Sequence, residues 1–213
     1  MKTEDSFRKL SLNGSVYPPA IQKAIEVAIV AHDGQTRKGK NVPYITHLLS
    51  VGLILARTGA TEDIIVAGIL HDVLEDTELT EDYLVKEFGK EVARIVNDVT
   101  EQDKSLPWEE RKRLALEHIS SMLPDSLLVK SADVLHNMSE QIQDYQREGE
   151  KTFLRFNQPK EQQLLRYQRL IAKLAEAWVD NPLLPDLQEN LVTINKEWSI
   201  EKRAKTEEER RGL

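Results

Sequence analysis

Helical periodicity is the feature that most constrains the fold of this chain. Apolar residues recur every three or four positions, the spacing that buries one face of an α-helix. The first such stretch, over residues 20–32, contains Ile21, Ala24, Ile25, Ala28 and Ile29. No segment alternates apolar and polar residues for long enough to predict a strand. The sequence therefore predicts an all-α fold of nine or ten helices.

Capping signals divide the periodic stretches into separate helices. Thr61, Thr80 and Asp125 are placed to cap helix starts, and Gly59 and Gly89 are placed to end helices. The expected helices cover residues 20–32, 46–56, 61–75, 83–88, 92–99, 108–122, 125–138, 161–179 and 187–198. We expect three parts: an N-terminal segment (1–18), a compact multi-helix domain (19–199) and a charged tail (200–213) that is either a solvated helix or disordered.

Composition limits the classes of partner. The 213 residues suffice for one hydrophobic core, and the absence of cysteine excludes thiolate metal sites and cysteine nucleophiles. A formal net charge of -7 disfavours a polynucleotide partner but allows a local basic pocket for a small anion. The mixed-charge start is not a signal peptide, and the longest apolar run is too short to span a bilayer. We therefore expect a cytoplasmic protein with no membrane partner; its oligomeric state is not predicted.

The segment 68–77 carries the strongest chemical signal. Within it, an apolar helix gains four ionisable residues in its last turns, namely His71, Asp72, Glu75 and Asp76. On a continuous helix these side chains would project from one side. Burial of such a cluster without a partner is costly, so a cation is expected to accompany it.

Two further residues complete a candidate ligand set. His47 lies at a predicted helix start, and Asp133 lies inside an otherwise apolar stretch. With His71 and Asp72 they provide two nitrogen and two oxygen ligands. This set leaves room for water and suits Mn²⁺, Fe²⁺ or a similar divalent transition metal better than Ca²⁺.

The order of these residues resembles the H…HD…D signature of HD-domain phosphohydrolases. The segment from His71 to Thr77 is similar, more narrowly, to the hydrolase domain of RelA/SpoT proteins. Segments 31–38, 43–47 and 132–138 carry the same resemblance, which runs from about Ile21 to Tyr145 and more weakly to about Trp178. The chain looks like a stand-alone SpoT-like small alarmone hydrolase, since it lacks room for a synthetase domain.

The resemblance implies a compact HD-domain helix bundle and a specific reaction. Such enzymes use Mn²⁺ to remove the 3′-pyrophosphate from (p)ppGpp, a small phosphorylated nucleotide, giving GDP or GTP. The implied metal ligands are His47, His71, Asp72 and Asp133. The implied catalytic residues are Glu75 and Asp76. The implied substrate contacts are Arg37, which can stack on a base, Lys38, which can bind phosphate, and Asn137.

Two other functions remain open. One is a metal-dependent nucleotidase or phosphatase acting on another small nucleotide, including an adenine alarmone. The other is a catalytically silent nucleotide-binding regulator. The chain also departs from the family pattern: Glu140 stands near a position that often carries a small hydroxyl or polar substrate contact, and the loop 39–42 is one residue longer than in the long bifunctional enzymes. These departures leave the choice between guanine and adenine open.

Overall fold

The computed structural model describes residues 17–101 and 105–211, with side chains described up to Trp198 except that of Trp108. Within these residues the regular secondary structure is helical apart from one isolated bridge between Thr36 and Pro43, which confirms the predicted all-α fold. The α-helices are α2 (Pro19–Ala31), α3 (Ile45–Arg57), α4 (Glu62–Ile69), α5 (Val73–Asp76), α6 (Glu81–Phe88), α7 (Lys90–Val99), α8 (Trp108–His118), α9 (Pro124–Glu148), α10 (Lys160–Ala177) and α11 (Leu184–Arg211). The short 3₁₀ helices are η1 (Ile119–Ser121) and η2 (Gly149–Arg155).

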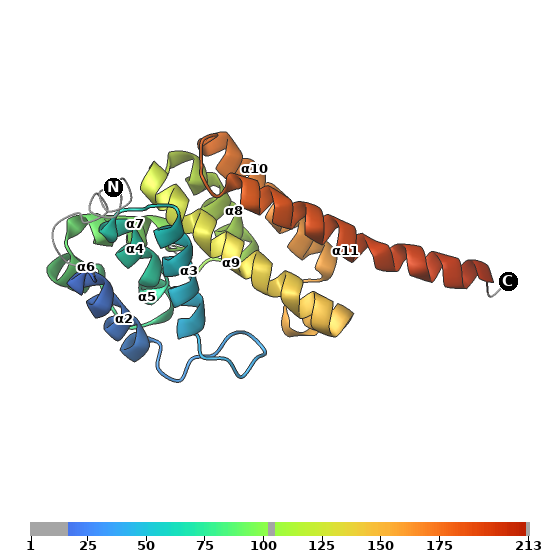
Figure 1. Ribbon diagram of the computed structural model, residues 1–213, viewed down its shortest axis with the longest axis horizontal. Coiled ribbons are helices and arrows are strands. Elements are labelled where there is room, and N and C mark those ends of the chain that lie inside the picture. Colours follow the sequence, from blue (N-terminus) through green and yellow to red (C-terminus); the bar gives the residue numbers. More distant parts are fainter. Residues whose placement is uncertain (1–16, 102–104, 212–213) are drawn as a thin grey trace, which may run out of the picture.

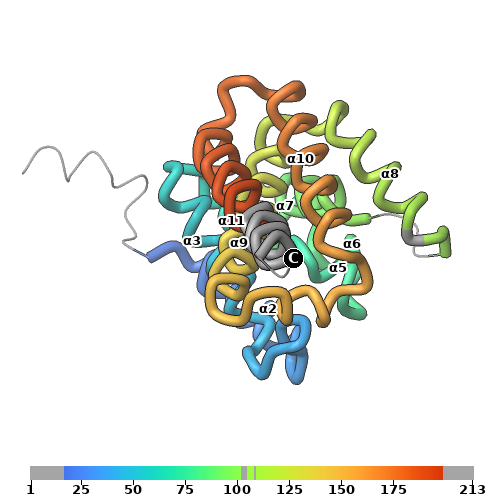
Figure 2. The backbone as a smooth tube through the Cα atoms, turned by 90° about the vertical axis from the view of Figure 1, so that its right-hand side faces the viewer, coloured from blue at the N-terminus to red at the C-terminus, as the bar shows by residue number. Residues whose placement is uncertain are grey.

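Helix α9 is the central element of the bundle (Figure 1). It contacts α3, α4 and α7 on one side and α11 on the other. Thirteen of its side chains are buried, from Ser126 to Tyr145. Figure 2 shows α10 running beside α11, with α8 at the edge of the bundle. Residues on α9 are therefore positioned against helices from both halves of the chain.

Two helix glycines allow α3 and α4 to pack closely. A Cβ atom added at Gly52 would lie 2.8 Å from Ile69 Cγ1, and one added at Gly68 would overlap Leu55 Cδ1. A side chain at either position requires Ile69 or Leu55 to shift, or the helices to separate. Because α3 carries His47 and α4 leads directly into His71, this close contact also sets the spacing of the two rings.

The helix expected over residues 61–75 is broken, and this is a correction to the sequence interpretation. It ends at Ile69, and a new short helix starts at Val73. The backbone tightens between them, with Val73 N donating to Leu70 O at 3.0 Å, while the His71 ring bonds to Gly68 O. The apolar periodicity continues through the break, so the sequence pattern could not reveal it.

Other helix ends differ less. The hydroxyl of Thr80 accepts a hydrogen bond from Tyr83 N, as its predicted capping role requires. Thr61 occupies an N-cap position but its hydroxyl makes no capping bond, and Asp125 lies in the first turn of α9 after Pro124 instead of capping it. The charged end is helical to Arg211. No described helix is both long and apolar enough to cross a membrane.

Replacing Gly68 with alanine tests the close packing of α3 and α4. Alanine is a better helix former than glycine by about 1 kcal/mol, but overpacking a tight core costs about 1–3 kcal/mol. We expect Gly68→Ala to lower the free energy of unfolding, measured by urea denaturation, and Gly52→Ala to act in the same direction. An increased urea midpoint in either variant would show that the helices can separate freely.

Candidate metal centre and its cavity

The structure brings the four predicted ligands to one place from three parts of the chain. His47 lies on α3, His71 and Asp72 lie in the turn between α4 and α5, and Asp133 lies on α9. One ligand atom from each of His47, His71 and Asp133 lies within 4.8 Å of the others, a grouping that could hold a metal ion. The Asp72 carboxylate adjoins this group, with Oδ2 3.0 Å from His71 Nε2 and 3.8 Å from His47 Nε2.

The hydrogen bonds of both rings leave their Nε2 atoms available to a cation. His71 Nδ1 lies 2.8 Å from the carbonyl of Gly68, so it must carry a hydrogen, and in the neutral ring Nε2 then holds a lone pair. His71 Nε2 is buried and faces the carboxylates of Asp72 and Asp133, at 3.0 and 3.8 Å. His47 Nδ1 lies 2.8 Å from His136 Nδ1, which orients the second ring. A buried imidazole nitrogen facing carboxylates, with its ring fixed from the opposite side, fits a divalent metal.

The electrostatics of the cluster are those of a site with excess negative charge. Burial favours the neutral ring of His71, but attraction to Asp72 and bonds to Asp133 outweigh burial and raise its pKa to about 10. Burial also opposes ionisation of Asp133, yet Lys130 and the histidines hold its pKa well below the usual range. Both carboxylates are therefore ionised, and either a proton or a cation must offset them.

Neighbouring polar groups orient the two carboxylates. The hydroxyl of Tyr44 donates to Asp72 Oδ2 at 2.7 Å, and burial together with the charge of Asp72 raises the pKa of this phenol, so it remains a donor. Asn137 Nδ2 donates to Asp133 Oδ1 at 2.6 Å, and Lys130 Nζ lies 3.3 Å from Asp133 Oδ2. Tyr44 and Asn137 therefore bond the same carboxylate oxygens that face the histidines, while Lys130 contacts the other oxygen of Asp133.

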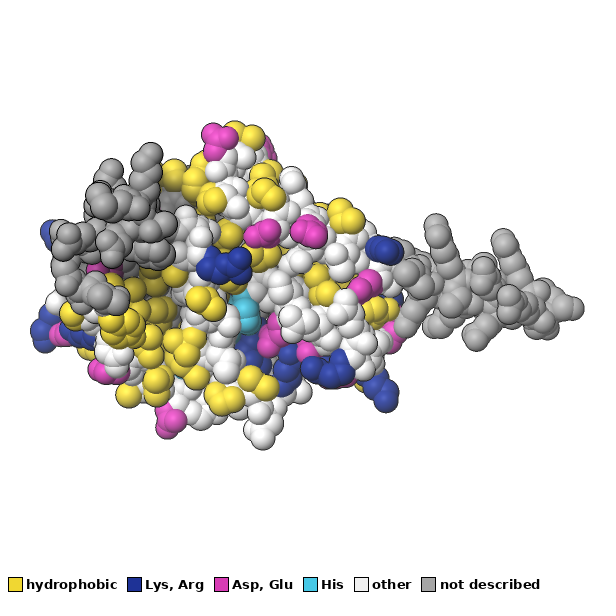
Figure 3. All heavy atoms as spheres, viewed as in Figure 1, with side chains coloured by type: hydrophobic (Ala, Val, Ile, Leu, Met, Phe, Trp, Pro, Cys, Tyr) yellow, Lys and Arg dark blue, Asp and Glu magenta, His cyan; other side chains and the backbone are white. Residues whose placement is uncertain are grey.

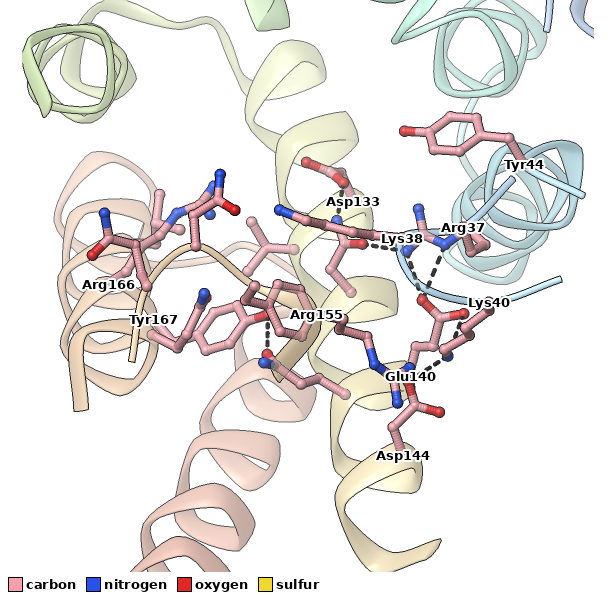
Figure 4. A pocket seen from close by; sticks show the side chains of 18 of the residues that line it. Arg37, Lys38, Lys40, Tyr44, Asp133, Glu140, Asp144, Arg155, Arg166 and Tyr167 are labelled. Atoms are coloured by element: carbon pink, nitrogen blue, oxygen red, sulfur yellow. Dashed lines mark hydrogen bonds and ion pairs between the residues drawn. The ribbon is translucent and has the colours of Figure 1, made fainter. Parts of the chain in front are cut away.

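A cavity of about 660 Å³ adjoins the cluster. It is lined by the ligand candidate Asp133 and by Tyr44, which bonds to Asp72. Figure 4 shows its two walls, with Arg37, Lys38 and Lys40 on one side and Arg166 and Tyr167 of α10 on the other. Asp133 lies between them on α9. The surface view in Figure 3 shows a histidine in a hollow flanked by acidic and basic side chains. The cavity has the size of a small-molecule site and both charge signs in its lining.

The loop 36–43 forms one wall and is fixed to α9 by ion pairs. Arg37 is only 9% exposed, and it donates to Glu140 through Nε and NH2, at 3.0 and 2.7 Å. Lys40 pairs with Glu140 and with Asp144, one helical turn further along α9. Arg155 of η2 also pairs with Asp144. We call this set (Arg37, Lys40, Glu140, Asp144 and Arg155) the ion-pair ladder.

A glycine lets the loop approach the ladder closely. Gly39 has a φ of 69°, and a Cβ atom there would lie 2.7 Å from Arg155 Cβ. Any other residue would face both an unfavourable backbone conformation and this clash. The loop backbone at Gly39 therefore packs directly against the Arg155 side chain.

The predicted substrate contacts have definite positions in this wall. The Arg37 guanidinium carbon lies 5.3 Å from the centre of the Tyr44 ring. Its NH2 donates to Asn137 Oδ1 at 2.6 Å, so Asn137 bridges Arg37 and Asp133. Lys38 is exposed, with Nζ 5.6 Å from the centre of the Phe156 ring. All three predicted contacts line the cavity.

The two predicted catalytic carboxylates lie on α5, immediately after the turn that carries His71 and Asp72. Glu75 is partly buried, and burial together with the charges of Glu101 and Asp72 raises its pKa. Asp76 is exposed, and its backbone carbonyl accepts a hydrogen bond from Gln35 Nε2 at 2.9 Å. Both adjoin the cluster through Asp72, whose carbonyl accepts from the amides of Glu75 and Asp76. The break before α5 gives them a direction that a continuous helix would not.

The sequence interpretation missed several cavity residues. Asp133, Asn137, Glu140 and Asp144 recur every three or four residues, and this polar stripe would have revealed the cavity wall. It was overlooked because the helix was expected to end near Met138. Other missed lining residues are Lys130, Gln141, Arg155, Arg166 and Tyr167.

Comparison with known proteins identifies the family. Residues 24–160 match the family described as HD domain. The chain belongs to the HD-domain family. Within this family, the guanosine-3′,5′-bis(diphosphate) 3′-pyrophosphohydrolase of Homo sapiens is 42% identical over 119 residues, which are 54% of this chain and 66% of the human protein. The corresponding protein of Drosophila melanogaster is 36% identical over 128 residues, 58% of this chain and 71% of the fly protein.

A solved structure of a metazoan orthologue of SpoT, described as hydrolysing ppGpp, is similar to this HD-domain chain with a TM-score of 0.69. The identity is 29%, and the match covers 83% of this chain and 96% of the other. A Listeria monocytogenes structure matches with a TM-score of 0.62 and 32% identity, covering 70% and 96% of the respective chains. The match to the human protein covers 66% of that protein's length, slightly less than two thirds.

The raised pKa of His71 predicts a pH-dependent stability for the metal-free protein. Because the pKa rises from 6.5 in a free ring to about 10 in the folded chain, the protonated ring stabilises the fold fully below pH 6.5. This contribution, on the order of a few kcal/mol, is lost as the pH rises towards 10. We expect the melting temperature of chelator-treated protein to fall over this range.

The matched control is His71→Gln, which removes the titrating ring and should flatten this part of the profile. A wild-type profile between pH 6.5 and 10 that matched the variant's would contradict the assigned coupling between His71 and the two carboxylates.

Proposed function

We propose that this HD-domain protein is a metal-dependent hydrolase that removes the 3′-pyrophosphate from (p)ppGpp-type alarmones, giving GDP or GTP and pyrophosphate. The observation that carries the proposal is the two-histidine, two-aspartate cluster at the edge of a 660 Å³ cavity with cationic side chains on both walls. Relatives that bear this activity in their names support it. We assign the catalytic unit to residues 19–199, with 1–18 and 200–213 as appendages.

We propose His47, His71, Asp72 and Asp133 as the ligands of Mn²⁺ or another divalent transition metal. Two imidazoles and two carboxylates suit such ions and leave positions for water. When bound, the metal supplies Lewis acidity, which favours ionisation of water and offsets charge on the attacked phosphate. His136 then acts as a positioning residue, since burial and His47 lower its pKa to about 4 and keep its ring neutral.

Glu75 and Asp76 are the proposed proton acceptors. Glu75 has a raised pKa, which suits a group that takes a proton from water as it attacks the phosphate. Glu75 follows the turn that carries His71 and Asp72, so it can act near the cluster without being one of the four ligands. Asp76, its exposed neighbour, would orient the water or share the proton.

We propose that the loop wall binds the nucleotide. The polar edge of Arg37 is already occupied by Glu140 and Asn137 and one of its faces lies over Tyr44, which leaves the other face of the guanidinium for stacking on a base. Lys38 is exposed and mobile enough to follow a phosphate. Asn137 would hold Arg37 in register with the ligand Asp133 and present its amide to the substrate.

A nucleotidase or phosphatase acting on a different small nucleotide would use the same cluster. The cavity lining has an acidic group, Glu140, beside the proposed base-stacking residue, and this favours no single base by itself. The products separate the two functions, since a nucleotidase releases orthophosphate.

The first functional prediction concerns products and metal. Wild-type protein loaded with Mn²⁺ should release pyrophosphate from ppGpp, measured by chromatography of the products, and chelation should abolish release. His71→Ala and Asp133→Ala should lose metal, measured by elemental analysis, together with nearly all activity. His118→Ala, which changes an exposed histidine paired with Asp98, is the control and should retain both. Orthophosphate release, or full activity after chelation, would contradict the proposal.

The second functional prediction concerns the carboxylates. Glu75→Gln or Asp76→Asn should lower kcat by a factor on the order of 10² or more, the scale of a lost general base, while the protein keeps its metal. Metal content and kcat must be measured on the same preparations. Loss of metal in proportion to activity would instead make these residues ligands or structural groups.

A further inference from the structure

A second cavity meets the first beside the metal centre. It has a volume of about 550 Å³ and lies between α8 and α10. Lys130, Arg166 and Leu170 line both cavities. Since Lys130 also contacts Asp133, the junction adjoins the proposed metal site directly. A ligand reaching from the metal towards α10 would therefore pass these side chains.

Arg166 and Arg169 differ from the other cations that line the second cavity. Lys112 pairs with Glu101, Lys130 pairs with Asp133, and Arg113 pairs with Glu110 and Glu117. Arg166 is exposed and makes no hydrogen bond or ion pair with any described residue. Its guanidinium thus keeps all its donors for a ligand.

The junction also gathers like charges. Burial lowers the pKa of Lys112, and the nearby charge of Arg166 lowers it further. Lys112, Lys130 and Arg166 all act on the carboxylate of Glu101, while Glu75 also attracts Lys112 and Asp133 pairs with Lys130. A multivalent anion would relieve this repulsion, whereas a neutral ligand would not.

We propose that Arg166, assisted by Lys112 and Lys130, binds the phosphate group of the substrate that is not cleaved, and so selects nucleotides phosphorylated at both the 3′ and 5′ positions. This inference rests on the proposed function and names a specificity residue for it. Arg166 lies across the cavity from Arg37, with Asp133 between them (Figure 4). A nucleotide with its base on the loop wall and one diphosphate at the metal can place its other diphosphate on α10. A planar guanidinium can hold that group through two parallel hydrogen bonds.

The decisive experiment compares two substrates that differ only at the 5′ position. Guanosine 3′-diphosphate 5′-diphosphate carries the proposed second group, and guanosine 3′-diphosphate with a free 5′-hydroxyl lacks it. Arg166→Gln in the Mn²⁺-loaded enzyme should raise KM for the first by about tenfold or more, the scale of a lost charged hydrogen bond. It should change KM for the second by less than about twofold. Arg166→Lys should restore part of the loss, because an ammonium keeps the charge without the bidentate geometry.

The matched control is Arg169→Gln. Arg169 lies on the same helix, carries the same charge and likewise has no ion-pair partner among the described residues, but it lines only the second cavity. It should have little effect on either substrate. Equal KM changes for both substrates in Arg166→Gln, or an equal effect of Arg169→Gln, would reduce the role of Arg166 to the general electrostatic field and overturn the proposal.

A binding measurement separates this inference from the proposed reaction. Calorimetric titration with GDP tests the 5′-diphosphate subsite without any hydrolysis, and inorganic pyrophosphate tests whether a free anion suffices. We expect Arg166→Gln to weaken GDP binding about tenfold or more, with thermal stability unchanged. If the wild-type protein hydrolysed no alarmone yet bound GDP through Arg166, the reaction would be wrong and the subsite would stand. Unchanged GDP affinity in the variant would overturn the subsite.

Discussion

Charge in a protein interior is costly unless it is paired, and the carboxylates of Asp72 and Asp133 impose that cost on this fold. Neighbouring side chains offset this cost. His47 and His71 face them, Tyr44 donates to Asp72, and Lys130 pairs with Asp133. These partners come from distant parts of the chain, so the cluster can exist only when α3, α4 and α9 are packed together.

The sequence was sufficient to predict a ligand set whose members the structure brings together, but not its surroundings. Ionisable residues such as His71 and Asp133 stand out because they interrupt apolar helix patterns, and that contrast is local. The turn before α5 is invisible to the same method, because the apolar spacing continues through it. No role could be assigned to Arg166 from the sequence either, because its place in the cavity depends on how α10 crosses the bundle.

Some missed residues had a readable signal. Glu140 and Asp144 continue the polar stripe that begins with Asp133 and Asn137, and only an early estimate of the helix end hid them. The stripe matters because it joins two tasks on one rigid element. Asn137 hydrogen-bonds both to the proposed ligand Asp133 and to Arg37, so the proposed metal centre and the proposed nucleotide wall share a side chain. A change at one should therefore be felt at the other.

The ion-pair ladder has a consequence for the thermodynamics of binding. Flexible loops usually lose conformational entropy when they close on a ligand, and each long side chain that is immobilised costs about 0.5–1.5 kcal/mol. Here Arg37 and Lys40 are fixed by Glu140 and Asp144 before any ligand arrives. That entropy was already lost when the chain folded. The loop wall should accordingly bind with a smaller entropic penalty than its length and charge suggest, and its shape should be nearly the same with and without nucleotide.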